Sequence, residues 1–167
     1  MPRFVLLRHD HPFEHYDLML EPEGDPPPDG DEARDLVTYR LPPRLPTGGQ
    51  TVPATPLPPH RRAYLWYEGP TRSGGGSVTR LAEGVYEVAG PGKTAADDAA
   101  NAPLVLDLRG REIRGGEIRG GEIAGGRDGV TEIAFRLTVD PRAPRHRPTP
   151  MRFESLPCSR PRPARGR

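Results

Sequence analysis

The chain has 167 residues and a formal net charge of +1, which fits one domain with additional loops or tails. Hydrophobic residues make up only 34%, while 20 residues are glycine and 23 are proline, a composition that excludes a helical bundle and predicts a mainly β fold. No stretch is apolar enough for a membrane span or a signal peptide, and the single cysteine, Cys158, cannot form an internal disulfide, so we expect a cytoplasmic monomer without membrane partners.

The first predicted elements are two strands joined by a connection around Pro12. Residues 4–7 form a short apolar run typical of a buried strand. Residues 15–21 alternate in polarity, so their side chains fall on the two faces of an extended strand. One face is apolar and holds Tyr16, Leu18 and Leu20, and the other holds His15, Asp17, Met19 and Glu21.

A hairpin of these two strands would place His9, at the end of the first strand, beside His15 and Asp17. Two imidazoles and one carboxylate make a facial ligand set that leaves positions open on a divalent metal ion. A competing hypothesis is a cupin-like metal oxygenase, because His9 and His11 with Glu14 mimic a His-x-His plus Glu signature. That arrangement predicts His9 and His11 as joint ligands and no role for Asp17.

The middle of the chain is predicted to alternate between short strands and loops rich in proline or glycine. We expect strands at residues 36–41, 77–81, 84–88, 104–108 and 130–137, the second and third forming a hairpin that turns at residues 82–84. The proline-rich residues 42–59 are expected to be a long irregular connection. A five-residue unit occurs three times between Glu112 and Gly126, and we interpret these copies as turn units that lengthen a hairpin.

The stretch from His60 to Pro70 is the densest in aromatic residues and contains the only tryptophan, Trp66. Tryptophan is a large apolar residue that is highly buried on average. We therefore expect Trp66 to lie in the core, with Arg61 and Arg62 at the surface.

The end of the chain, residues 141–167, is strongly basic, with eight arginines and one glutamate. Its prolines and arginines predict a disordered tail beyond a domain of residues 1–140, although Met151-Arg152-Phe153 could dock on the domain. Such a tail serves either as a solubilising segment or as an electrostatic tether to nucleic acid.

Two of these stretches together resemble a known family, the 3′-phosphoesterase domain that occurs at the N-terminus of bacterial DNA ligase D and as stand-alone proteins. The matching pattern consists of His9-Asp10, His15-Tyr16-Asp17, and then His60, Tyr64 and Glu68-Gly69. Arg8 stands where the family has a lysine. The similarity covers about residues 3–138, so the chain is identified as a divergent stand-alone member.

The resemblance implies a small closed or partly open β-barrel with long Pro/Gly-rich loops and little helix. It further implies a Mn²⁺ ion bound by His9, His15 and Asp17, with Zn²⁺ or another divalent metal as the alternative. His60, assisted by Tyr64, would contact the phosphate and take part in acid–base catalysis.

The activity that the resemblance implies is the healing of DNA or RNA–DNA 3′ ends in DNA repair. The family removes a terminal ribonucleoside from a primer strand and then the 3′-phosphate, leaving a 3′-hydroxyl. The expected partners are therefore these nucleic-acid ends, together with a DNA ligase or another end-joining protein.

The sequence departs from the family at positions that bind phosphate. Met19 replaces an arginine that would share the face of His15 and Asp17, and methionine cannot supply a bidentate guanidinium. Arg61 and Arg62 are the expected substitutes, because Arg62 lies on the face of His60 and Tyr64 if alternate residues line one side of a strand. Without a substitute, which Arg40 could also provide, the chain would be a non-catalytic module that binds metal and nucleic-acid ends.

Overall fold

The first two strands form the hairpin that the alternating pattern predicts. Strand β1 (Arg3–His9) pairs antiparallel with β2 (His15–Leu20), and the register places His9 opposite His15. The apolar face of β2 lies in the larger of two apolar clusters, whereas Met19, on the opposite face, lies in the smaller one. The predicted division of β2 into two faces is confirmed.

The structure is a computed structural model that describes residues 1–43, 51–72, 74–91, 104–112, 124–125, 131–139 and 149–155. After the first hairpin these residues form β3 (Arg34–Leu41), β4 (Thr51–Arg61), β5 (Gly69–Pro70), β6 (Ser77–Pro91), β7 (Leu104–Glu112), β8 (Ala124–Gly125), β9 (Thr131–Val139) and β10 (Thr149–Ser155). Two short 3₁₀ turns accompany them, η1 (Gly30–Glu32) and η2 (Arg62–Leu65). No helix in this part of the chain has the length and apolar character needed to cross a lipid bilayer.

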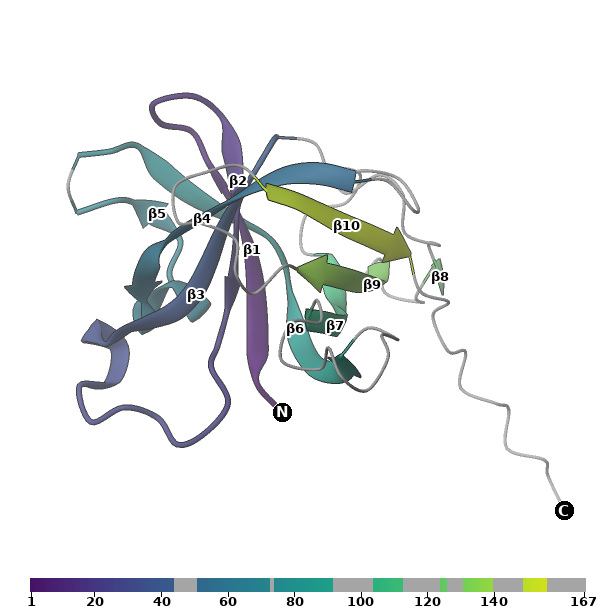
Figure 1. Ribbon diagram of the computed structural model, residues 1–167. Helices are drawn as coiled ribbons and strands as arrows, with labels where there is room; N and C mark the ends of the chain where they lie inside the picture. Colours follow the sequence, from purple (N-terminus) through teal and green to yellow (C-terminus); the bar gives the residue numbers. More distant parts are fainter. Residues whose placement is uncertain are drawn as a thin grey trace, which may run out of the picture.

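Eight of the described strands close into an antiparallel barrel in the order β1-β2-β3-β4-β10-β9-β7-β6, and β6 pairs back to β1 (Figure 1). The two-residue strands β5 and β8 pair with β6 and β9 outside this ring. Closure satisfies the backbone groups that an open sheet would leave at its edges. The predicted mainly β fold with a small barrel is confirmed in its closed form.

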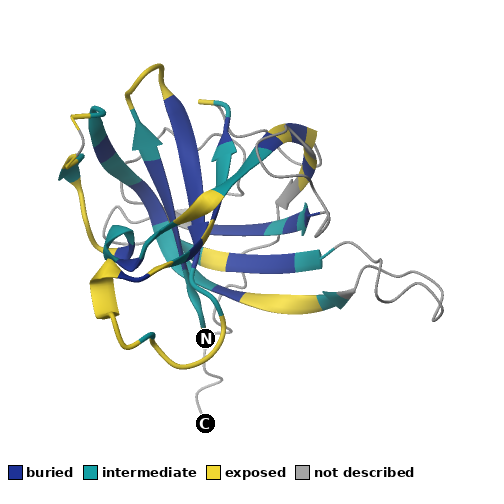
Figure 2. Cartoon of the chain, turned by 60° about the vertical axis from the view of Figure 1, so that its left-hand side comes forward, coloured by how far each residue is buried: buried dark blue, intermediate teal, exposed yellow. Residues whose placement is uncertain are grey.

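Two apolar clusters hold the barrel together. The larger takes residues from all eight barrel strands, such as Leu6, Leu18 and Leu137, and fills the interior. The smaller lies on the outer face of β1, β2 and β3, where Leu65 of η2 covers Leu7 and Met19. Buried residues follow the strands, whereas the loop between β2 and η1 is largely exposed (Figure 2). The side chains at the end of this outer face form the candidate site.

Residues 77–91 form one long strand instead of the predicted hairpin. Gly84, where we expected the turn, lies opposite Gly110 of β7, and a Cβ on Gly84 would come within 2.1 Å of the Arg109 carbonyl oxygen. Leu81 and Ala82 are completely buried, whereas residues in a hairpin turn are usually exposed. The glycine therefore allows close contact between two strands and does not mark a reversal.

Residues 42–59 are not a wholly irregular connection, because β4 begins at Thr51. This strand tolerates its prolines because it pairs with β10 through residues 51–54 and with β3 through residues 55–61. Each half thus has one side without a described strand partner, where the missing N–H of proline costs no ladder hydrogen bond.

The predicted boundary at residue 140 is wrong for residues 149–155, which form a barrel strand. Strand β10 lies between β4 and β9, and Met151 is 1% exposed within the larger cluster. A seven-residue segment can be ordered here because strands on both sides take up its backbone groups, which composition alone does not indicate. Residues 141–148 and 156–167 of the predicted tail lie outside the described residues, as does most of the five-residue repeat.

Candidate metal centre

Three side chains converge where the β1–β2 hairpin opens. The rings of His9 and His15 lie edge to face with centroids 4.9 Å apart. Oδ2 of Asp17 is 3.8 Å from His9 Nδ1 and 3.6 Å from His15 Nε2. The three ligand atoms lie within 4.8 Å of one another, so His9, His15 and Asp17 form a group that could hold a metal ion.

Backbone carbonyls fix the orientation of both imidazoles. Nε2–H of His9 donates to the carbonyl oxygen of Gly75 at 2.6 Å, and Nδ1–H of His15 donates to that of Phe13 at 2.7 Å. Because a carbonyl only accepts, these nitrogens carry protons, so in a neutral ring the lone pair is on His9 Nδ1 or His15 Nε2, the atoms that lie nearest Asp17. A hydrogen bond from the second ring nitrogen is the usual support of a metal-binding histidine. The sequence carries no signal for these carbonyls, because any residue has one.

The same three residues lack hydrogen bonds among themselves. His15 Nε2 and Asp17 Oδ1 are buried without a hydrogen-bond partner among the described residues. A metal ion with bonds of about 2.1 Å separates adjacent ligand atoms by about 3–3.5 Å, somewhat less than the 3.8 and 3.6 Å from Asp17 Oδ2 to the nitrogens of His9 and His15. The donor set of two nitrogens and one carboxylate oxygen suits Mn²⁺ and Zn²⁺ alike. These residues therefore fit a divalent cation.

His11 takes no part in this group. It is exposed in the loop before β2, and Asp10 beside it accepts a hydrogen bond from the backbone N–H of Ser77 at 2.7 Å. The structure brings Asp17, not His11, to His9. This arrangement disfavours the cupin-like ligand set.

His60 and Tyr64 lie together because a turn follows β4. His60 is near the end of β4, Tyr64 lies in η2, and their ring centroids are 5.9 Å apart. Nδ1–H of His60 donates to the Pro58 carbonyl oxygen at 3.0 Å. Burial lowers the pKa of His60, although the Asp17 carboxylate acts in the opposite direction. We therefore expect His60 to be neutral at pH 7, with Nε2 as its available nitrogen.

A basic pocket of about 280 Å³ surrounds this pair of rings. Besides His60 and Tyr64 it is lined by Arg34, Arg61, Tyr67 and Arg72 and by the acidic Glu32. Arg61 and Arg72 lie 3.6 and 3.2 Å from carboxylate oxygens of Glu32. Three arginines against one glutamate leave the pocket with positive charge, as an anion-binding site requires.

Arg62, in contrast, does not face His60. It is buried and donates to Glu21 and to Asp35, whose Oδ2 is 2.5 Å from Arg62 Nη2. The strand ends at Arg61, so the alternation that would have placed Arg62 beside His60 stops there. The prediction that Arg62 binds phosphate is therefore contradicted by its position: both carboxylates neutralise it inside the protein.

Met19, at which the resemblance to the 3′-phosphoesterase domain would lead one to expect an arginine, is part of the core. Met19 is 1% exposed and packs in the smaller apolar cluster. Arg40 lies opposite Asp17 in the β2–β3 register, with Nε 3.8 Å from Asp17 Oδ1. It is thus the arginine that the structure places beside the metal group, and Arg61 remains beside His60.

Glu21 joins β1 to η2 through two arginines, and this makes stability depend on pH. The hydrogen bonds from Arg3 lower the pKa of Glu21 to about 2, against its burial, and Arg62 adds to the effect. A carboxylate whose pKa is depressed on folding stabilises the folded state above its unfolded pKa, and this contribution is lost as pH falls through the folded pKa.

We expect Glu21 to contribute about 2–3 kcal/mol to the free energy of unfolding at neutral pH, and this contribution to disappear between about pH 4.5 and pH 2. Urea unfolding of wild type and Glu21→Gln at several pH values measures it. The variant should show a shallower loss of stability in this window, whereas Glu23→Gln, at an exposed site, should follow wild type. Parallel curves for wild type and Glu21→Gln would contradict the assignment.

Comparison with known proteins adds no assignment: no protein-family model matches the chain, and no curated protein matches it. The similarity to the 3′-phosphoesterase domain therefore rests on the motifs alone.

Proposed function

We propose that this protein is a metal-dependent phosphoesterase that acts on the 3′ ends of DNA or RNA–DNA strands in the cytoplasm. The observation that carries this proposal is the convergence of two imidazoles and a buried carboxylate, with His60 in an arginine-lined pocket and within electrostatic reach of Asp17. A bound Mn²⁺ or Zn²⁺ ion would neutralise phosphate oxygens and lower the pKa of a coordinated water. A DNA ligase or end-joining protein would then use the 3′-hydroxyl.

The residues of the chain have distinct roles in this proposal. His9, His15 and Asp17 would hold the ion. Nε2 of His60 lies free of the Pro58 hydrogen bond and exchanges a proton with a phosphate or leaving oxygen, a step typically worth about 10²–10⁴-fold in rate. Tyr64 packs against the His60 ring and limits its rotation.

A second candidate function is a non-catalytic module that binds metal and nucleic-acid ends. Two observations favour it: Met19 is buried in the core, and Arg62 is neutralised by Glu21 and Asp35. Neither position can therefore provide a bidentate contact to a phosphate. Turnover distinguishes the two functions.

The test uses a DNA strand with a 3′-phosphate and one with a single 3′-ribonucleotide, each incubated with the full chain and Mn²⁺. We expect release of phosphate and of the terminal ribonucleoside, and a rate about 10²-fold lower for His60→Ala because proton transfer is lost. Metal affinity should be unchanged in this variant. The matched control His11→Ala, at an exposed histidine, should cleave like wild type.

If the protein binds these DNA strands but does not cleave them in Mn²⁺ or Zn²⁺, the second function would replace the first. Equal rates for His60→Ala and wild type would remove His60 from the mechanism while leaving the metal group in place.

A further inference from the structure

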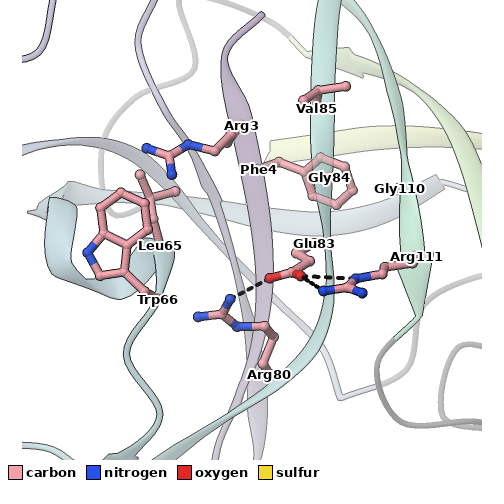
Figure 3. A pocket seen from close by; sticks show the side chains of 10 residues that line it. All are labelled: Arg3, Phe4, Leu65, Trp66, Arg80, Glu83, Gly84, Val85, Gly110 and Arg111. Atoms are coloured by element: carbon pink, nitrogen blue, oxygen red, sulfur yellow. Dashed lines mark hydrogen bonds and ion pairs between the residues drawn. The ribbon is translucent and has the colours of Figure 1, made fainter.

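A second pocket lies on the other side of η2 and has no part in the proposed reaction. Its volume is about 620 Å³, and Leu65 and Trp66 line it, whereas His60 and Tyr64 line the pocket described above. Pockets of 300–1,000 Å³ are typical of small-molecule sites. Figure 3 shows Arg3 and Trp66 on one side of it and Glu83 and Arg111 on the other, with Arg80 between them.

One wall of this pocket is a pair of flat side chains held in place. Trp66 is 48% exposed, contrary to the expectation that it lies in the core. Its indole N–H donates to Asp31 Oδ1 at 3.0 Å, and the guanidinium carbon of Arg3 lies 4.1 Å from the ring centre. Arg3 is fixed in turn by two hydrogen bonds to Glu21. An exposed tryptophan with a fixed ring is a stacking surface for another planar group.

The opposite wall is cationic. Glu83 lies 2.5 Å from a guanidinium nitrogen of Arg80 and 2.5 Å from one of Arg111, so one carboxylate faces two arginines. Two further nitrogens of Arg80, Nε and Nη2, are buried without a hydrogen-bond partner among the described residues. These two nitrogens are closed off from solvent, so Arg80 contributes its charge to this wall, and the 57% exposed guanidinium of Arg111 is the group that an anionic oxygen can contact.

The floor between these walls is bare backbone. Gly84 and Gly110 are register partners, and a Cβ on Gly110 would lie 2.1 Å from the Glu83 carbonyl oxygen. Val85 and Phe4 complete an apolar base. The two glycines let β6 and β7 approach closely, and the volume of about 620 Å³ leaves room for a ring of the ligand between the flat wall and the cationic wall.

We infer that this pocket binds a nucleotide, with the base against Trp66 and Arg3 and the phosphate at Arg80 and Arg111. A simple anion would make no use of the aromatic wall, and an uncharged ring would make no use of the arginines. The same chemistry is offered by a free mononucleotide and by one nucleotide unit of a single strand. The inference does not depend on the metal group, and its test is separate from that of the phosphoesterase activity.

The only tryptophan of the chain lies in this pocket, so its fluorescence reports binding without a label. The full chain is titrated in EDTA with adenosine 5′-monophosphate, adenosine, inorganic phosphate and a short oligothymidylate, with correction for ligand absorbance. We expect saturable quenching by the mononucleotide. Adenosine and phosphate should each bind with an affinity at least about tenfold lower than that of the mononucleotide. If the oligonucleotide binds more tightly than the mononucleotide, the ligand is a nucleotide unit of a single-stranded nucleic acid. If the mononucleotide binds more tightly, the ligand is a free nucleotide.

Two matched variants locate the phosphate. Arg111 is more than half exposed and projects from β7, as does the exposed Arg109, which does not line the pocket. Arg111→Gln should weaken mononucleotide binding about tenfold, whereas Arg109→Gln should bind like wild type. His9→Ala should also bind like wild type, which separates this site from the metal centre.

Absence of saturable quenching at millimolar nucleotide would overturn the inference, as would equal losses in Arg111→Gln and Arg109→Gln. Equal affinity for adenosine and its monophosphate would remove the phosphate from the assignment and overturn it as stated.

Discussion

Asp17→Asn is expected to lower the affinity for Mn²⁺ by at least about 10²-fold and to abolish turnover at 3′ ends. Asp17 supplies the one carboxylate of the group, and its Oδ2 lies within 3.8 Å of the available nitrogen of each histidine. Asparagine keeps the shape of the side chain but removes the negative charge that would compensate the cation. Asp17 is almost completely buried, and it is the only carboxylate among the three residues of the group.

Isothermal titration with Mn²⁺ and with Zn²⁺ measures this loss, and thermal melts in EDTA show whether the variant remains folded. His11→Ala and Glu14→Gln are matched controls, because both residues are exposed in the same loop and lie outside the group. Both should bind metal like wild type. Loss of metal in His11→Ala with wild-type affinity in Asp17→Asn would instead support the cupin-like ligand set.

Arg62→Met should destabilise the folded protein by about 3 kcal/mol, because the variant leaves Asp35 without its cation and leaves Glu21 with Arg3 alone. Arg62 donates to Glu21 and Asp35, and its side chain is only 6% exposed. These bonds connect η2 to the end of β2 and the start of β3. Since η2 carries Tyr64 and Leu65, its loosening should also disturb both pockets that flank it.

Urea unfolding at pH 7 measures this effect, with Arg61→Met as the matched control. Arg61 is the preceding residue, but it pairs at 3.6 Å with a mostly exposed Glu32, so its loss should cost no more than about 1 kcal/mol. Arg62→Lys keeps the charge but not the planar fork, and an intermediate loss is expected. A change below 1 kcal/mol in Arg62→Met would show that the network does not stabilise η2.

The metal group could be predicted because every step from sequence to geometry is local. Residues 15–21 alternate, a short loop joins them to the preceding strand, and a hairpin then places His9 opposite His15. Side-chain direction in a strand depends only on the parity of the position, so Asp17 must lie on the same face as His15. The mainly β fold likewise follows from short apolar runs between glycine- and proline-rich segments.

The roles of Arg62, Trp66 and residues 149–155 depend on partners far away in the chain. Arg62 turns inward because Glu21 and Asp35 lie beside η2, and Trp66 remains at the surface because Arg3 and Asp31 hold its ring there.

The sequence by itself thus determined the faces of the first hairpin and the grouping of His9 with His15 and Asp17. Only the tertiary structure decided which arginines are available to a ligand and which segment closes the barrel. The physical reason is that alternation acts between neighbouring residues, whereas burial, charge pairing and strand order depend on contacts between segments that the sequence does not place side by side.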